Sequence, residues 1–383
     1  MKHLVPTAVS SALWPAGGTL LCAEAGGYLM PLLLGPMAAT YAIGEAAAGG
    51  VLAVQLGAFA VAAIALAPRL GALSPRRGAL LALLLIVAGN LLSASQPVVW
   101  SLVCGRVLAG LGEGMAAAVA AAAIARKADP DRAFARVFIA VVLMTLAIFL
   151  LLPGLVAGQD ARLLFLGAAC VPMLAIPAAL ALPDRVEVQT PAAARVRGPY
   201  SVRALQICAA ITLYSVSANS YWVYVERIAT GIGMSPEAFG KAFAIGVICA
   251  LAGPVAAERL GTRWGRVPPL TVGCVLLAIG GWLSTHATTP LLLTVGVTVS
   301  SAALLFGTPY LLGLAAMVDP SGRVAGAGRG FNNVGSAIAP ALAAGILGAT
   351  GAYTSFGWIS VAAAAGALAL VLLSARRAPQ AAG

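Results

Sequence analysis

The chain has 383 residues, of which 61% are hydrophobic and 9% are charged, and its mean hydropathy is +0.97. Soluble globular proteins carry about 25% charged residues, and disordered chains need low hydrophobicity and high charge. The composition therefore excludes both classes and indicates a membrane protein. The net charge of +11 comes from small Lys and Arg clusters between apolar runs, not from one basic stripe, which argues against nucleic acid as a partner.

Apolar runs long enough to span a bilayer, about 20 residues each, follow one another along the whole chain. They begin near residues 12, 46, 78, 99, 137, 163, 204, 238, 269, 291, 324 and 352. The longest interruption, 183–203, is polar and rich in Arg. We therefore expect an all-α membrane protein with twelve transmembrane helices in two pseudo-symmetric six-helix bundles. The predicted bundles are 1–182 and 204–383, joined by a linker at 183–203.

The basic residues are distributed unequally between the two predicted sides of the membrane. If both termini are cytoplasmic, that side holds 18 of the 23 Lys and Arg residues. The other side holds Arg162, Arg227 and Lys241, and two lie within apolar runs, Arg106 and Arg329. Cytoplasmic loops of membrane proteins are enriched in Lys and Arg. We therefore predict a multi-pass membrane protein with both termini in the cytoplasm.

An internal repeat relates the two halves. Residues 67–71 read APRLG and residues 257–261 read AERLG, an offset of 190 residues. Arg76 and Arg266 keep the same offset. Both copies follow the second predicted helix of their half, so they mark equivalent loops. A repeat of this kind is typical of transporters built from two parallel halves.

Two motifs resemble those of the major facilitator superfamily, and the resemblance extends over essentially the whole chain. One is the loop after the second helix of each half, and the other is an Arg followed by Gly residues in the fourth helix: Arg106, Gly110 and Gly114. The second loop copy has Glu258 in place of the family's Asp, whereas the first has Pro68 there. The residues that match the loop motif are Arg69, Gly71, Glu258, Arg259, Gly261 and Arg263.

The resemblance implies a secondary transporter of a bacterial inner membrane that works as a monomer by alternating access. It further implies a central cavity lined by the first, fourth, seventh and tenth helices. We expect proton-coupled efflux of a small organic compound such as a drug or metabolite. The alternative is a proton symporter or uniporter that imports a sugar or similar nutrient, because the fifth helix lacks the Gly-Pro-rich signature of drug–proton antiporters. A non-transporting membrane sensor is a further alternative.

Acidic residues within apolar runs are the sharpest chemical signal. Glu24 lies near the middle of the first predicted helix and Glu113 near the middle of the fourth. Arg106 precedes Glu113 by seven residues, about two helical turns, so the two share a face. A charge in the bilayer centre costs at least about 2.5–3.5 kcal/mol and commonly serves function. We predict that Glu24 or Glu113 carries a proton and that Arg106 modulates it; a static charge pair is the alternative.

Polar residues in two other helices are candidate cargo contacts. Tyr214 and Asn219 belong to a polar and aromatic run in the seventh helix, and Gln55 is an isolated polar residue in the second. Rings with a few polar groups suit small amphipathic molecules, although residues such as Gln55 also form interhelical hydrogen bonds. Arg329 lies near the predicted cytoplasmic end of the eleventh helix, where we expect its side chain to reach the interface.

Several classes of chemistry have no support in the sequence. A phosphate-binding GxxxxGK[ST] motif is absent, so ATP-driven transport is not expected. The two His and six Cys residues lack metal-ligand spacing, and a nucleophile–base pair is not apparent. We therefore predict a protein that is not an enzyme and that binds no metal or cofactor, with a small molecule, a proton and the lipid bilayer as its partners.

Overall fold

Helices make up almost all of the chain that the computed structural model describes, which is residues 13–156, 160–184 and 201–376. Most of the expected linker at 183–203 lies outside these residues, so its boundaries stay a prediction. The first half contains α1 (Leu13–Thr40), α2 (Glu45–Leu66), η2 (Ala67–Arg69), α3 (Pro75–Ser95), α4 (Val99–Ala125), α5 (Pro130–Val156) and α6 (Ala161–Leu180). The second half contains α7 (Val202–Asn219), η3 (Trp222–Tyr224), α8 (Val225–Gly231), α9 (Pro236–Ala250), α10 (Ala252–Leu260), α11 (Val267–Thr285), α12 (Pro290–Val318), α13 (Arg323–Thr350) and α14 (Ser355–Arg376).

Short polar caps begin several of these helices. The Ser74 hydroxyl accepts a hydrogen bond from the Arg77 N–H at 3.2 Å, and Pro75 occupies the first helical position of α3. Thr289 caps α12 in the same way, followed by Pro290. Such residues satisfy exposed N–H groups at the start of a helix, and proline is tolerated there because its missing N–H is not needed. The positions at which these helices begin are therefore determined by the residues at their own N-termini.

The eighth apolar run is broken into two helices. α9 ends at Ala250 and α10 begins at Ala252. Pro254 lies in the first turn of α10. In an uninterrupted helix its ring would clash with the carbonyl of Ala250, four positions earlier, and the break avoids this clash. The fifth helix also differs from expectation: it begins at Pro130, not near 137, so its polar first turns extend beyond the apolar run.

The predicted fold class is confirmed as a helical membrane architecture. Among the described residues, nine segments are long and apolar enough to cross a membrane. The order of elements is consistent with twelve spans if α7, η3 and α8 form the seventh and α9 and α10 the eighth.

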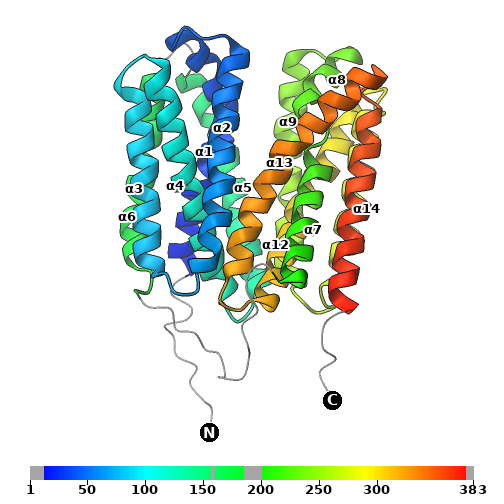
Figure 1. Ribbon diagram of the computed structural model, residues 1–383. Helices are drawn as coiled ribbons and strands as arrows, with labels where there is room; N and C mark the ends of the chain where they lie inside the picture. Colours follow the sequence, from blue (N-terminus) through cyan, green and yellow to red (C-terminus); the bar gives the residue numbers. More distant parts are fainter. Residues whose placement is uncertain (1–12, 157–159, 185–200, 377–383) are drawn as a thin grey trace.

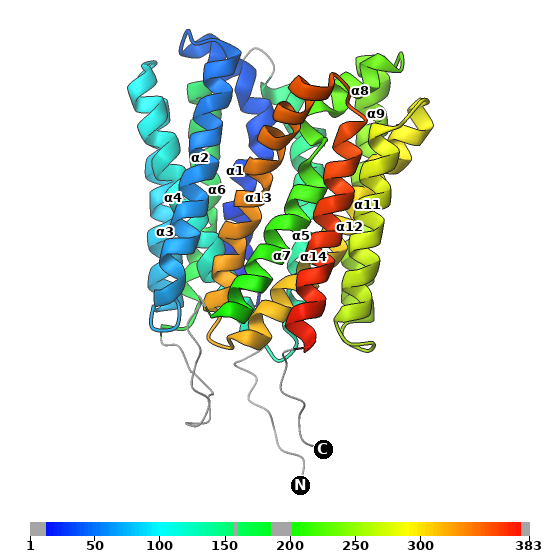
Figure 2. The same ribbon diagram turned by 45° about the vertical axis from the view of Figure 1, so that its right-hand side comes forward.

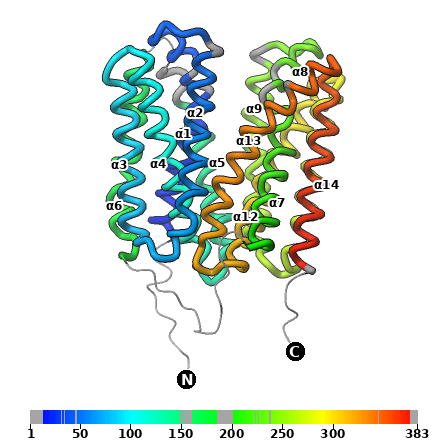
Figure 3. Tube along the Cα trace, in the orientation of Figure 1, coloured from blue at the N-terminus to red at the C-terminus, as the bar shows by residue number. Residues whose placement is uncertain are grey.

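The helices form two bundles that lie side by side, α1–α6 in one and α7–α14 in the other (Figures 1 and 2). α1 begins and α14 ends at the same end of the molecule, which we term the basal end; the opposite end is the distal end. The bundles are joined at the basal end and diverge towards the distal end, where α13 leans away from α2 (Figures 1 and 3).

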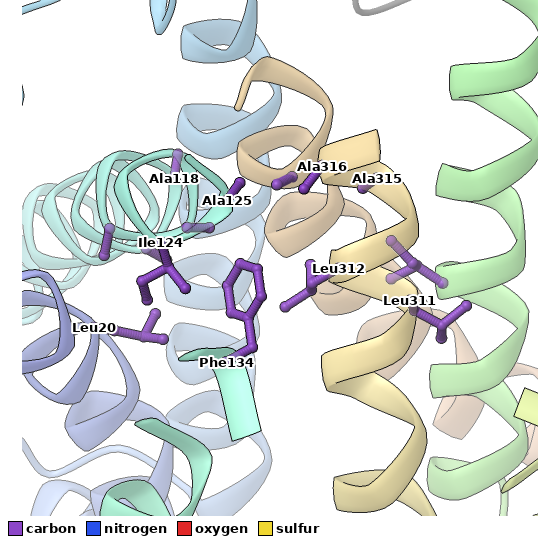
Figure 4. Close-up of a cluster of buried hydrophobic side chains, with 14 of the residues drawn as sticks. Leu20, Ala118, Ile124, Ala125, Phe134, Leu311, Leu312, Ala315 and Ala316 are labelled. Carbon is purple, nitrogen blue, oxygen red and sulfur yellow. The ribbon is translucent and has the colours of Figure 1, made fainter. Parts of the chain in front are cut away.

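One continuous hydrophobic core joins the two bundles at the basal end. Phe134 of α5 lies between Ile124 of α4 and Leu312 of α12, with Leu20 of α1 nearby (Figure 4). All four side chains are fully or almost fully buried. The closed basal end is therefore held by apolar packing between the halves as well as by polar contacts.

Glycine residues set the distance between α2 and α4. A Cβ atom added to Gly114 would collide with the Phe59 carbonyl, and one added to Gly110 would collide with the Gln55 carbonyl. The small-xxx-small spacing of Gly110 and Gly114 thus allows close backbone contact. This contact brings the side chain of Gln55 on α2 against α4.

Candidate functional site

An ion pair joins the two bundles. The Nη2 atom of Arg329 on α13 donates to Oε1 of Glu24 on α1. The side chain of Arg329 is 3% exposed and that of Glu24 is 15% exposed. The guanidinium also lies 5.7 Å from the centre of the Phe138 ring on α5. Our expectation that Arg329 reaches the membrane interface is therefore wrong: its side chain is buried between the halves.

Small residues on α13 explain how Arg329 comes so close to the first bundle. A Cβ atom on Gly330 would lie 2.9 Å from the Ala60 carbonyl of α2, and Gly326 is similarly close to the Ala118 carbonyl of α4. Larger residues at these positions would push α13 away from both helices. The backbone therefore packs tightly enough for the Arg329 side chain to cross to α1.

Glu113 on α4 occupies a different environment. Gln55 Nε2 on α2 lies 2.9 Å from each carboxyl oxygen of Glu113. The residues Glu113 and Gln55 are 3% and 1% exposed. Gly26 on α1 leaves room for the carboxyl group, because a Cβ atom there would collide with it. Gln55, predicted as a cargo contact, thus serves as the neutral hydrogen-bond donor to this acid.

Arg106 does not contact Glu113. Its Nε donates to Ser93 Oγ at 3.0 Å and its Nη2 to Asn90 Oδ1 at 2.7 Å, both on α3. Its guanidinium also lies over the Phe165 ring of α6, 4.3 Å from the centroid. Seven residues along a helix return to the same face but are about 10 Å apart along the axis. Each side chain therefore bonds to the neighbours at its own level, and Arg106 connects α4 to α3 and α6.

The candidate cargo residues of α7 separate into two environments. Tyr214 is 1% exposed, and its hydroxyl donates to the Ala303 carbonyl of α12 at 2.5 Å. It thus lies inside the second bundle, where it packs against Gly307 of α12. Asn219 is partly exposed and donates to the Ser215 carbonyl at 2.8 Å.

Asn219 belongs to a small polar group that α7 and α13 form together. Ser215 and Ser336 have their hydroxyl oxygens 2.9 Å apart, and Asn219 Nδ2 lies 3.4 Å from Ser336 Oγ. Asn332 and Asn333 are also partly exposed on the same stretch of α13. Polar side chains at membrane depth face other protein or a hydrated cavity, not lipid. These five residues are termed the α7–α13 polar group.

The loop motif of the second half contacts the first half. Glu258 Oε1 accepts from Arg136 Nη2 on α5 at 3.0 Å, and the Glu258 carbonyl accepts from Arg132 Nε at 3.2 Å. Gly261 has a positive φ of 53°, and a Cβ atom there would lie 2.6 Å from Arg132 Nε. Among the other motif residues, Gly71 lies near the turn before α13. The remaining three are exposed: Arg69, Arg259 and Arg263.

Two further contacts close the basal end, and the sequence analysis missed both. Arg266 Nη2 lies 2.6 Å from Asp131 Oδ2, and the aspartate side chain is 1% exposed. Arg126, just after α4, donates to the Ser321 carbonyl and to the Leu70 carbonyl, each at 2.7 Å. Burial lowers the pKa of Arg126 to about 10. The repeat offset singled out Arg266, but nothing in the sequence predicted that its partner lies on the opposite half.

Comparisons with known proteins support the fold assignment. Searches against protein-family models and against curated proteins found no match. Among solved structures, the human organic anion transporter MFSD10 (TETRAN) has a TM-score of 0.75 and 19% identity, covering 95% of this chain and 100% of its own. The proton:xylose symporter XylE has a TM-score of 0.74 and 14% identity, with 95% of both chains covered.

A third structure adds a conformational comparison. The transporter FucP in its outward conformation has a TM-score of 0.74 and 13% identity, covering 94% of this chain and 98% of its own. All three structures are major facilitator superfamily transporters or share their fold. The chain therefore has the fold of the major facilitator superfamily, as its sequence motifs indicated.

Proposed function

We propose that this protein is a secondary active transporter that couples proton movement to the efflux of a small organic compound by alternating access. The Glu24–Arg329 pair carries the proposal. It is a buried carboxylate whose cationic partner belongs to the other half of the molecule. Alternating access separates the halves at one end while it joins them at the other. A contact between α1 and α13 is therefore made in one state and broken in the other.

Glu24, and not Glu113, is the proton carrier in this proposal. The hydrogen-bond partner of Glu113 is Gln55 on α2, in the same half, so rigid-body movement of the halves leaves that bond intact. Glu24 instead loses Arg329 when the basal end opens. A carboxylate that loses its cation in an apolar setting is stabilised by taking up a proton. The change of partner thus links proton binding to conformation.

The closed basal end corresponds to an outward-facing state if both termini are cytoplasmic, as the distribution of Lys and Arg favours. In this proposal a monomer in a bacterial inner membrane opens its distal end to the outside. The apolar core around Phe134 and the Asp131–Arg266 and Arg136–Glu258 pairs support this reading, because they join the halves at the basal end. Arg106 holds α4 against α3 through its hydrogen bonds to Ser93 and Asn90.

A second candidate function is uptake of a sugar or similar nutrient. The α7–α13 polar group offers uncharged hydroxyl and amide groups, which suit a hydroxyl-rich cargo. The fold accommodates this function as well, because XylE and FucP share it. A fold alone does not select a substrate, so the direction of cargo movement must be measured.

The test is cargo-triggered proton movement in reconstituted vesicles that contain a pH-sensitive dye. A panel of drugs, sugars and amino acids is applied to the wild type, Glu24→Gln and Glu113→Gln. We expect a compound-dependent proton flux that Glu24→Gln abolishes and that Glu113→Gln retains. Cargo movement without any proton flux in all three proteins contradicts coupling, and the sign of the flux relative to cargo distinguishes cotransport from exchange.

A further inference from the structure

The guanidinium of Arg329 is only partly used by Glu24. Its Nη2 donates to Glu24 Oε1, whereas its Nε is buried and has no hydrogen-bond partner in the described part of the chain. Nε and Nη2 form one edge of the guanidinium, and this edge fits the two oxygens of a carboxylate. A buried donor without an acceptor is costly. The edge can therefore accept a better-fitting carboxylate than the one it holds.

Arg329 lies where the closed part of the molecule ends. In the first turns of α13 and the two residues before it, residues 321–330 are buried except for Arg323, and the four that follow are partly exposed. Glu24 is the more exposed member of the pair, at 15%. The α7–α13 polar group lies on the distal side of Arg329. A cargo entering from the distal end thus meets polar side chains first and the ion pair at the boundary of the closed region.

Charge balance selects the kind of cargo that this boundary accepts. Glu24 and Arg329 together are neutral, and a charge left unpaired in a buried site is strongly unfavourable. A cation added to the pair leaves an excess positive charge beside Arg329. An anion added to the pair is balanced if Glu24 takes up one proton. Two arrangements are therefore neutral. In one Arg329 is paired with Glu24, and in the other Arg329 is paired with an anionic cargo while Glu24 is protonated.

We infer that the cargo is a small organic monocarboxylate that replaces Glu24 at the Nε–Nη2 edge of Arg329, while Glu24 takes up one proton from water on the open side. The inference rests on the proton coupling and alternating access of the proposed function. It assigns the direction of the second candidate, uptake, because one proton and one anion move together from the open side. On the opposite side the carboxylate leaves, Glu24 releases its proton, and the ion pair forms again. No covalent bond is made or broken apart from the O–H bond of Glu24.

Other titratable groups face Glu24 and belong to the same balance. Arg329 approaches from α13, Glu113 from α4, and Tyr28 lies one turn further along α1. In this inference one proton is taken up for each anion bound. Each unit rise in pH should therefore weaken carboxylate binding about tenfold where Glu24 is ionised in the free protein. Replacing Glu24 by Gln removes this dependence, whereas replacing Glu113 by Gln leaves it in place.

The experiment uses the purified full chain in detergent with probes matched in shape and different in charge. One set is benzoate, benzamide and benzylammonium, and the other is hexanoate, hexanamide and hexylammonium. Binding is measured by the shift in thermal midpoint, and proton uptake is measured with an indicator dye in weak buffer. We expect the carboxylates to bind at least about tenfold more tightly than the amides, with one proton taken up for each anion bound.

Variants separate the roles of the two residues. Arg329→Lys keeps the charge but loses the flat edge, so carboxylate affinity should fall at least about tenfold. Glu24→Gln should bind carboxylates without proton uptake, and it keeps the inference testable if Arg329→Lys does not fold. Arg77→Gln is the control, because the Arg77 side chain is 79% exposed and lies outside the contact between the halves.

The outcomes distinguish this inference from the proposed function. Equal or tighter binding of the amides or amines, or carboxylate binding that Arg329→Lys leaves unchanged, overturns the inference. Absence of carboxylate binding at millimolar concentration also overturns it. If carboxylates bind through Arg329 but vesicles transport nothing, the site stands and the proposed transport fails. If vesicles couple protons to neutral or cationic compounds only, transport stands and the inference fails.

Discussion

Arg329 and Glu24 form a buried ion pair although 305 residues separate them along the chain. The pair joins α1 of one bundle to α13 of the other. Its members are 3% and 15% exposed. It lies between the buried first turns of α13 and the partly exposed residues that follow them.

Removing one partner of this pair should destabilise the protein more than removing both. Arg329→Gln leaves a buried carboxylate without its cation, and such a change costs about 3–5 kcal/mol. Combining it with Glu24→Gln should recover part of this loss, because no charge is then left unpaired. The free energy of unfolding in detergent, measured for both single variants and the double variant, gives the coupling.

The control for this cycle is Arg77→Gln, which removes a surface pair with Asp184. Exposed pairs contribute at most about 1 kcal/mol. If Arg329→Gln has no larger effect than Arg77→Gln, the buried pair does not stabilise the contact between the halves.

Two glycine positions should respond in opposite directions to the same substitution. Gly114→Ala places a Cβ against the Phe59 carbonyl of α2, so we expect a loss of about 1–3 kcal/mol. Gly167→Ala on α6 meets nothing within 4 Å and should be neutral or stabilise by up to about 1 kcal/mol, because alanine favours the helix. Thermal unfolding in detergent measures both. A loss of the same size in both variants would contradict the packing role of Gly114.

Tyr214 and Asn219 should differ in their effects on transport. Tyr214→Phe removes a hydrogen bond to the Ala303 carbonyl inside the second bundle, so stability should fall by about 1 kcal/mol while the apparent KM for cargo stays unchanged. Asn219→Ala changes the α7–α13 polar group and should raise the apparent KM. The reverse pattern, with cargo affinity lost in Tyr214→Phe alone, would show that α7 presents the other face to cargo.

Weakening the basal contacts should favour opening at that end. Asp131→Asn removes the charge that Arg266 binds at 2.6 Å, and a loss of about 1 kcal/mol shifts a two-state equilibrium about fivefold. A cysteine in place of the fully buried Ala118, in a background without the native cysteines, should then react about fivefold faster with a polar thiol reagent. Asp184→Asn, which breaks a contact within the first half, is the matched control and should leave the rate unchanged.

The contact made by Arg126 should not respond to pH in the physiological range. Burial lowers the pKa of this guanidinium from 12.5 to about 10. The folded state therefore disfavours its charge, a cost that is constant below pH 10 and is relieved only as pH rises above 10. Stability profiles of the wild type and Arg126→Gln should run parallel between about pH 6 and 8. Profiles that diverge in this range would assign a proton-sensitive role to the basal end.

The sequence predicted the helices well because lipid imposes a simple rule on them. A span needs a continuous apolar run, so each helix could be located from composition, and Glu24 and Glu113 were recognisable as exceptions within such runs. The breaks in the seventh and eighth spans were not predicted. In the eighth span the break occurs at Pro254. The sequence alone does not show whether a proline begins a new helix or lies within a continuous one.

The partners of the charged residues could not be predicted in the same way. The seven-residue spacing predicted that Arg106 and Glu113 share a face of α4, but it did not predict their partners. Arg106 donates to Asn90 of α3, and Glu113 accepts from Gln55 of α2. Arg329 was expected at the interface because of its distance from the start of the helix. Its burial depends on how closely α13 packs on α2, which glycine residues on α13 permit and which only the folded structure reveals.

The order of synthesis gives the Glu24–Arg329 pair a further consequence. Proteins are made and inserted from the N-terminus, so α1 enters the bilayer long before α13 has been translated. During that interval Glu24 has no access to its observed cation, and an uncompensated charge at this depth is expensive. Glu24 must therefore be accommodated without Arg329 until the second half has been inserted. The pair can therefore form only after residues of both bundles have been inserted.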